Sequence, residues 1–451
     1  MQTAGRWQRL SNLTRVPFAF RRLLTPALLL GAAFLAAQAP PGSCNNACLV
    51  ERAQEALAAG RYADYLGAAR QFAARAPDHP GVIYAVARGF ALLGKPDSAL
   101  AWLEQLVRIG ATRAPDSDSA FAPLRNSRAF RALQARLDAN RVPVVHGKAA
   151  FALPDPDLLP EAMDWDPSTA SWIVGSLSQR KVIRVRPDGS TTDFISASDL
   201  LRVVGIHVDS ARSLLWFATW APRPDSTAPH HEPMTETRLF KCDLRRGRVL
   251  RRYVPPDSGT SHLFNDLAIA ANGDVYVTDT EQGWLYRVTA DSDSLEVFLQ
   301  PDPNQFSEAN GITLARGDRA LYVAFLEGIA RVDLRTRQIA RLGSPLNAST
   351  AEIDGLYWYR GALLGVQHAP GLEEVVRYQL TRDGGSIRQV DVLERGDSIL
   401  RLPTTGAVVG TRLYYIANSQ FDRLGDDNRL SPATVSPPPL TVVRVVELED
   451  H

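Results

Sequence analysis

The chain has 451 residues, of which 45% are apolar and 22% are charged, and this composition is typical of a globular protein large enough for two domains. Fifty basic residues stand against 49 acidic ones, for a formal net charge of +1. Such a balance provides no broad positive surface, so nucleic acid and anionic membrane surfaces are excluded as expected partners.

The N-terminal residues have the pattern of an export signal. Five arginines precede the apolar run 23–37, and Ala37-Gln38-Ala39 has the small residues that signal peptidase prefers. The run contains Pro26 and falls short of the roughly 20 apolar residues that a membrane-spanning helix needs. We therefore predict a signal peptide over residues 1–39 and an exported chain, periplasmic or secreted, with no membrane span after cleavage. The alternatives are an anchor formed by an uncleaved N-terminal segment or by lipidation of Cys44.

Three cysteines are too few to hold this fold together by disulfides, so burial has to stabilise it. Cys44 and Cys48 are candidates for pairing in an oxidising compartment, although a four-residue spacing would strain a disulfide inside a regular helix. Cys242 ends the strand-like run Leu239-Phe240-Lys241-Cys242, and we predict that it is a buried free thiol.

Residues 44–142 are predicted to form a small all-α domain, because helix formers recur with helical period and β-branched runs are few. Ala59-Gly60-Arg61 recurs 34 residues later as Leu93-Gly94-Lys95, and 34 residues is the tetratricopeptide period. Ala76-Pro77-Asp78-His79-Pro80 breaks the chain between the units. Such repeats usually expose a concave surface to peptides, so this tetratricopeptide-like domain has either a protein partner or the plainer role of a cap on the next domain.

A second, all-β domain is predicted over residues 146–450. Six versions of one strand recur at intervals of 43, 60, 46, 42 and 51 residues, and the longest interval contains the polar, proline-rich insert 221–237. The strands are Ile173-Val174-Gly175-Ser176, Trp216-Phe217-Ala218-Thr219, Tyr276-Val277-Thr278-Asp279, Tyr322-Val323-Ala324-Phe325, Leu364-Gly365-Val366-Gln367 and Tyr415-Ile416-Ala417-Asn418. This period predicts a six-bladed β-propeller, with residues 222–236 as a lid over one end.

The ends of the β-domain predict how the ring closes. The last blade ends after its third strand, whereas the run 148–153 precedes the first blade without a partner. We therefore predict that residues 148–153 form the outer strand of the sixth blade. A basic residue recurs in the third strand of each blade, as in Arg184, Arg377 and Arg444, and alternation is expected to place it on a solvated face.

Equivalent positions at the start of the innermost strands meet around the central channel of a propeller. The predicted ring consists of Glu161, Val204, Asn265, Asn310, Asp354 and Thr405. Four of these offer carboxylate or amide oxygen and none is Cys or His, so the set favours calcium over zinc. Asn-Asp, Asn-Gly and Asp-Gly are also common in turns, but turn chemistry does not require the same position in four blades. We predict one divalent cation, preferably Ca²⁺, held by Glu161, Asn265, Asn310 and Asp354.

At these residues the chain resembles the gluconolactonase, regucalcin and paraoxonase-like six-bladed propellers. The motifs are Pro160-Glu161, Phe264-Asn265-Asp266, Asn310-Gly311-Ile312 and Asp354-Gly355-Leu356, and the resemblance covers about residues 146–450. It implies one catalytic divalent ion, usually calcium, and hydrolysis of lactones or other esters. Glu161, Asn310 and Asp354 would be direct ligands, and Asn265 a ligand or a substrate contact.

The resemblance also implies a mechanism. The ion would polarise the lactone carbonyl, while Asp354 or a water on the ion would supply the base or nucleophile. Sugar-lactonase relatives tend to have an arginine two residues before the Asn-Asp pair. This chain has Leu263 there, so a sugar acid would lose an expected partner.

Further residues are placed near the channel mouth by topology, because the loop after each second strand emerges there. The predicted substrate pocket contains Asp266 of the Asn-Asp pair and six loop residues: Ser178, Asp279, Gln367, His368, Asn418 and Ser419. His207 is expected to be structural, since its strand position points away from the channel.

Two functions follow from this pattern. The first is an exported calcium-dependent hydrolase of lactones or related esters. The second is a non-catalytic, metal-containing binding protein that recruits a protein or small ligand through its helical repeat or channel mouth, because one fold hosts many functions.

Overall fold

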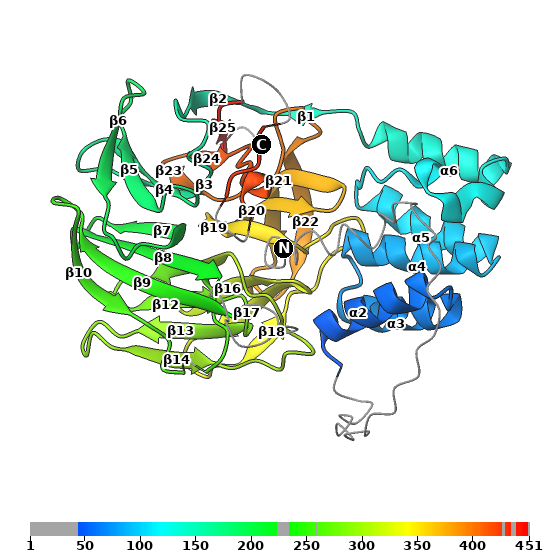
Figure 1. Ribbon diagram of the computed structural model, residues 1–451, viewed down its shortest axis with the longest axis horizontal. Helices are drawn as coiled ribbons and strands as arrows, with labels where there is room; N and C mark the ends of the chain where they lie inside the picture. The colour runs from blue at the N-terminus through cyan, green and yellow to red at the C-terminus, as the bar shows by residue number, and fades with distance from the viewer. Residues whose placement is uncertain (1–43, 223–233, 258, 426–428, 434–438, 450–451) are drawn as a thin grey trace, which may run out of the picture.

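The computed structural model describes residues 44–222, 234–257, 259–425, 429–433 and 439–449, and Figure 1 shows their arrangement. The signal peptide predicted over residues 1–39 and most of the predicted lid lie outside these ranges. The described chain is a helical region followed by a ring of β-sheets, as the sequence predicts. None of the described helices is both long and apolar enough to cross a membrane.

The helical region begins with two pairs of α-helices. They are α2 (Asn46–Ala58), α3 (Tyr62–Arg75), α4 (Pro80–Leu92) and α5 (Pro96–Arg108), and α4 and α5 begin 34 residues after α2 and α3. The turn of each pair contains a glycine with left-handed backbone, Gly60 at φ 70° and Gly94 at φ 64°, which explains why glycine recurs there. The short 3₁₀ helices η1 (Pro115–Ser117) and η2 (Ser119–Leu124) and the helix α6 (Arg128–Ala139) complete the region.

The two N-terminal cysteines form a disulfide, with a distance of 5.4 Å between their Cα atoms. Cys44 precedes the first residue of α2, so the bond does not have to fit inside a regular helix. Cys242 is buried and free, as predicted, and burial raises the pKa of its thiol to about 12.

The described strands after residue 146 form six sheets, and the first strands of neighbouring blades contact each other around the channel. Blade 1 consists of β3 (Pro160–Asp166), β4 (Ser171–Ser176), β5 (Lys181–Val185) and β6 (Thr191–Ile195). Blade 2 consists of β7 (Arg202–Asp209), β8 (Leu214–Pro222), β9 (Thr235–Asp243) and β10 (Arg248–Tyr253). Blade 3 consists of β11 (Phe264–Ile269), β12 (Val275–Asp279), β13 (Trp284–Val288) and β14 (Leu295–Leu299).

The remaining blades follow the same order. Blade 4 consists of β15 (Ile312–Leu314), β16 (Ala320–Phe325), β17 (Gly328–Asp333) and β18 (Ile339–Arg341). Blade 5 consists of β19 (Ile353–Tyr359), β20 (Ala362–Ala369), β21 (Leu372–Leu380) and β22 (Ile387–Arg395). Blade 6 consists of β23 (Gly406–Val409), β24 (Arg412–Ile416), β25 (Val442–Glu447) and the N-terminal β2 (Gly147–Ala152), and a short 3₁₀ helix, η3 (Phe421–Arg423), follows β24.

Ring closure by the N-terminal run is confirmed. The antiparallel pairing of β2 with β25 matches Lys148 with Val445, so the two ends of the β-domain share one blade. The sequence did not predict β1 (Val144–Val145), which adds a fifth strand to blade 5 by pairing with β22.

The prediction that the third-strand cations face solvent is wrong for three blades. Arg184, Arg377 and Arg444 are buried. Arg184 donates to Leu244 O of the next blade at 3.3 Å, and Arg444 donates to Glu394 of the preceding blade at 3.0 Å. Both faces of a propeller blade pack against neighbouring blades, so these strands have no solvated face. The buried charges find partners inside the protein instead, Arg184 with Asp166 of its own blade at 2.7 Å and Arg444 with Glu394 of the neighbouring sheet.

Candidate functional site

The inner strands of four blades carry a β-bulge at the predicted ring position. Their registers shift between Pro160 and Met163, between Val204 and Ile206, between Phe264 and Leu267, and between Ile353 and Gly355. A glycine follows several of the ring positions, because a side chain there would collide with the surrounding atoms. A Cβ on Gly311 would lie 2.5 Å from Asp354 O of the next inner strand. The recurring sequence motif therefore reflects tight strand packing around the channel as well as the polar side chain beside it.

The four oxygen-bearing residues of the predicted ring are all buried, and they meet at one end of the channel. Glu161, Asn265 and Asp354 line one cavity of about 90 Å³. Asn310 is joined to them by a hydrogen bond of 2.8 Å from its Nδ2 to Asp354 Oδ1. The shared register found in the sequence thus corresponds to a single polar cluster in space.

Hydrogen bonds define which way the two ring amides point. Thr280 Oγ1 donates to Ala309 O, so it accepts from Asn265 Nδ2 at 2.9 Å, and Asn265 presents Oδ1 as its remaining polar atom. A carboxylate only accepts, so Asn310 directs Nδ2 to Asp354. Asn310 Oδ1 is buried and has no hydrogen-bond partner among the described residues. An orphaned buried oxygen is a marker of a missing partner.

The two ring carboxylates are destabilised in their charged form. Burial raises the pKa of Glu161 well above its usual range, and the charges of Asp354 and Asp266 raise it further. Burial also raises the pKa of Asp354, although His368 and the Asn310 amide act in the opposite direction. A cation between these side chains would lower both pKa values and so oppose the effect of burial.

The chemistry of the cluster fits a hard divalent ion. In the described part of the chain, no three His, Cys, Asp or Glu side chains group as a metal site would require. The ring differs from such groups because it has two carboxylates, and its other donors are amide oxygens. Calcium accepts six to eight oxygen ligands of these kinds, which leaves coordination positions for water or substrate. Such an ion would give Asn310 Oδ1 a partner and would stabilise the charged forms of Glu161 and Asp354.

His368, assigned to the substrate pocket from the sequence, lines the same cavity. Its Nδ1 lies 3.0 Å from Pro403 O and 3.7 Å from Asp354 Oδ2. Both oxygens are acceptors, so Nδ1 carries the hydrogen and Nε2 is the basic nitrogen of the neutral ring. Asp354 and His368 therefore form an acid–base pair beside the ring.

Four other residues of the predicted pocket are absent from the cavity lining and bond to neighbouring loops. Ser178 donates to Asp157 O, Gln367 to Ala351 O, Asn418 to Leu440 O and Ser419 to Leu402 O. These side chains fix the loops around the channel mouth. A contact with substrate remains a prediction for them.

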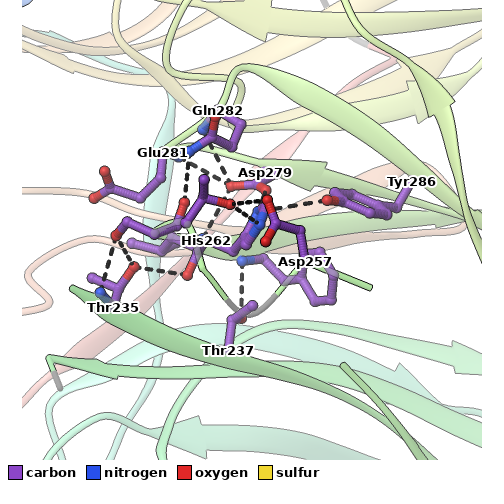
Figure 2. A network of polar contacts seen from close by, with 12 residues as sticks. Thr235, Thr237, Asp257, His262, Asp279, Glu281, Gln282 and Tyr286 are labelled. Carbon is purple, nitrogen blue, oxygen red and sulfur yellow. Dashed lines mark hydrogen bonds and ion pairs between the residues drawn. The ribbon is translucent and has the colours of Figure 1, made fainter. Parts of the chain in front are cut away.

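Asp279, also predicted in the pocket, belongs to the polar network in Figure 2. Its Oδ2 accepts from His262 Nδ1 at 2.6 Å, and its Oδ1 accepts from Leu263 N at 3.0 Å. Leu263 and Thr280, which lie beside this pair in sequence, line the cavity. The network therefore holds in place the two segments that bring Leu263 and Thr280 to the cavity.

Most of the surface of the cavity wall is apolar, and of its apolar residues only Val204 and Leu263 were singled out from the sequence. It contains Leu177, Val204, Trp220, Leu263, Phe421 and Leu424. The polar lining residues that the sequence did not indicate are Arg202, Thr280, Glu281 and Glu308. Arg202 had one usable signal, because it stands two residues before Val204, as Leu263 stands before Asn265. Its guanidinium lies over the Trp220 ring at 4.9 Å and donates to Gly425 O.

A second polar tier lies further along the channel and consists of Asp164, His207 and Asp266. His207 Nδ1 is 3.6 Å from Asp164 Oδ2, and its Nε2 is 3.4 Å from Asp266 Oδ1. The expectation that His207 points away from the channel is wrong. The bulge in β7 inserts one extra residue before His207, so His207 and Val204 face the same way despite their three-residue spacing. Asp266, predicted in the substrate pocket, lies in this tier and not in the cavity lining.

Solved structures with a similar fold include propeller enzymes with different activities. A gluconolactonase from Xanthomonas campestris matches at 15% identity and a TM-score of 0.46, over 69% of this chain and 92% of its own. A streptogramin B lyase matches at 16% identity and a TM-score of 0.44, over 66% and 96%. An aldose sugar dehydrogenase from Streptomyces coelicolor, in its PQQ-bound form, matches at 13% and 0.46, over 66% and 97%. No protein-family model and no curated protein matches the sequence. Similarity at this level assigns no activity to the chain.

Proposed function

We propose that the chain is an exported, metal-dependent hydrolase of apolar lactones or related esters. Glu161, Asn310 and Asp354 would hold one divalent ion, preferably Ca²⁺, with Asn265 as a further ligand or a substrate contact. The observation that carries the proposal is the buried cluster of two carboxylates and two amides beside a cavity with a mostly apolar surface, in which Asn310 Oδ1 has no partner among the described residues. When bound, such an ion supplies Lewis-acid polarisation of the ester carbonyl.

The protein's own contribution to the reaction is acid–base chemistry and orientation. Asp354 is the proposed catalytic carboxylate, and the neighbouring His368 can take up a proton at Nε2 while its Nδ1 hydrogen stays directed at Pro403 O and Asp354. The negative charge of Asp354 stabilises the imidazolium that results. Asn310 keeps Asp354 oriented through its hydrogen bond to Oδ1.

The cavity wall supports an apolar substrate. Hydroxyl groups of a sugar lactone that lie against Leu177, Leu263 and Leu424 lose hydrogen bonds to water without replacement. Polar partners come from the rest of the lining, at Arg202, Thr280, Glu281 and Glu308. An alkyl- or aryl-substituted lactone would bury apolar surface on the same wall instead. The absence of an arginine at position 263 favours the same choice.

Export and a protein partner are also proposals. The Cys44–Cys48 disulfide supports export, because disulfides persist mainly in oxidising compartments, and it occupies the sulfur that lipidation of Cys44 would need. The 34-residue offset of the helix pairs supports the interpretation as a tetratricopeptide-like domain, a class that commonly binds peptides.

The proposal is tested with a panel of lactones and aryl esters, each assayed with calcium and with a chelator. We expect medium-chain γ- or δ-lactones to be hydrolysed faster than gluconolactone. We expect the chelator to remove the activity and added calcium to restore it. A protein that binds the ion tightly but hydrolyses no member of the panel would instead support the alternative of a metal-containing binding protein.

A further inference from the structure

The helical region is attached to the propeller close to the proposed site. Figure 1 shows α2–α5 beside blades 4 and 5, and Leu326 of the propeller packs into the apolar core formed by α2, α3 and α4. The α3–α4 turn, which the sequence marks as a break, carries Asp78 and His79 into this interface. Besides Arg341, the turn contacts residues 350–352, which come shortly before the ring residue Asp354.

His79 connects the start of α4 to Glu352. Its Nδ1 accepts from the backbone of Gly81 at 3.1 Å and of Val82 at 3.4 Å, so this nitrogen carries no hydrogen. The hydrogen is therefore on Nε2, which donates to Glu352 Oε1 at 3.0 Å. The His79 side chain is 0% exposed and that of Glu352 is 3% exposed. One buried imidazole thus caps a helix and binds the propeller.

Asp78 holds the same segment at a second point. Its Oδ2 accepts from Thr350 N at 2.9 Å and from Thr350 Oγ1 at 2.7 Å. Its Oδ1 accepts from Arg341 Nη2 at 2.9 Å. Residues 350–352 are therefore bound by two consecutive residues of the helical region.

The segment held in this way leads to both members of the acid–base pair. Glu352 has a left-handed backbone, φ 56°, which a residue with a side chain adopts only where the surroundings maintain it. The Glu352 carbonyl accepts from His368 N at 3.2 Å. Asp354 follows two residues later, at the bulge of β19.

We infer that Asp78 and His79 are positioning residues of the propeller site, so that the helical region forms part of the scaffold that orients Asp354 and His368. This inference rests on the proposed function for its catalytic consequence. The geometric part does not, because it concerns the conformation of residues 350–356 in the protein without a ligand.

The test uses His79→Asn in the mature full-length chain. Asparagine is a good helix N-cap, so the start of α4 keeps an acceptor, but its shorter side chain does not reach Glu352. The matched control is Thr112→Val, which removes another hydrogen bond between the two regions, to Gly371 O at 3.0 Å, without a contact to residues 350–354.

Two measurements are made on each variant: hydrogen exchange of peptides covering 350–356 and 366–370, and calcium affinity by calorimetry. For His79→Asn we expect faster exchange in both peptides and roughly tenfold weaker calcium binding, the lower end of the effect of supporting residues on metal sites. The Thr112→Val control should retain the affinity and exchange of the parent in these peptides.

Parent-like exchange in His79→Asn would overturn the inference, whatever the calcium result. If the unmodified protein binds no calcium, the proposed function fails, and faster exchange in His79→Asn would still support the positioning role. Faster exchange with unchanged calcium affinity would overturn the claim that the positioning extends to the site.

Discussion

Two polar clusters occupy the same channel and satisfy their charges in different ways. In the tier formed by Asp164, His207 and Asp266, a histidine between two carboxylates supplies the positive charge from within the protein. In the ring tier, burial raises the pKa values of Glu161 and Asp354, and neighbouring carboxylates raise them further. Burial also raises the pKa of Asp164 in the other tier, but there the charge of His207 between the two carboxylates acts against it. A buried acidic cluster is stabilised by a cation. The tier around His207 contains its own, and in the proposed function the ring tier takes one from solution.

The largest expected effect is on catalysis at the ring. We predict that Asp354→Ala, assayed at saturating calcium, lowers the rate of lactone hydrolysis by roughly 10²- to 10⁴-fold, the range typical of a lost general acid–base group. The fold should be preserved, because the substitution removes a buried carboxylate with a raised pKa. Initial rates and circular dichroism measure the two properties. Turnover equal to that of the parent protein would eliminate Asp354 as the catalytic residue.

Glu161→Gln removes one negative charge from the ring while keeping the shape of the side chain. We expect calcium affinity to fall by roughly a hundredfold, because losing one of two anionic ligands in a buried site costs about 3 kcal/mol. Calorimetric titration provides the measurement, with Ser178→Ala as a control at a nearby loop residue outside the cavity lining. An affinity like that of the parent would show that the ring is not the ion's site.

The pH dependence of the two tiers should have opposite signs. Calcium binds the ionised form of Glu161 and Asp354, so its affinity should increase as pH rises through their raised pKa values, by about tenfold per pH unit for each proton released. Titrations between about pH 5 and 8, in buffers of different ionisation enthalpy, count the protons. An affinity independent of pH over this range would contradict the assignment of raised pKa values to the ring.

His207 should show the reverse behaviour in stability. Burial lowers its pKa, but the hydrogen bond and charge of Asp266 and the charge of Asp164 raise it above the ordinary 6.5. A raised pKa in the folded state means that this stabilisation is complete below pH 6.5 and is lost as pH rises through the folded value.

The smallest expected effect on the ring is that of His207→Gln. Its side chain is 28% exposed, so we expect a loss of about 1 to 3 kcal/mol in the free energy of unfolding at pH 6, below the cost of breaking a fully buried ion pair. Calcium affinity should change less than threefold at that pH, since the variant leaves all four ring donors in place. Urea denaturation measures the stability and calorimetry the calcium affinity. A larger effect on calcium affinity than on stability would contradict the assignment of His207 to a tier separate from the calcium site.

Much of the fold could be predicted because the repeat can be recognised in the sequence without knowing which distant residues are in contact. The recurrence of one strand at intervals near 43 residues defines the blades, and the unpaired run 148–153 identifies the closing strand. The same register brings Glu161, Asn265 and Asp354 to one cavity, and the observed hydrogen bond joins Asn310 to Asp354. Residues at equivalent positions of a repeat can be assigned to one group from the sequence alone.

The residues that were misplaced depend on departures from the repeat. His207 was assigned to the wrong face because simple alternation does not include the bulge in β7. Arg184 and Arg444 were expected in solvent, because an isolated strand shows no sign of the neighbouring blade that covers its outer face. Trp220, Phe421 and Leu424 of the cavity wall were not predicted, because they come from loops and strand ends of two blades.

The two-region organisation, the six blades, the strand that closes the ring and the residue types at the ring can all be recognised in the sequence, because each produces a period or a composition along the chain. The contents of the polar clusters and the contacts that support them depend on tertiary packing. The bond between His79 and Glu352 joins residues 273 positions apart, and the bulges choose which side chains share a face. Such contacts arise when whole blades and helices pack together, and no periodicity along the chain encodes which pair will meet.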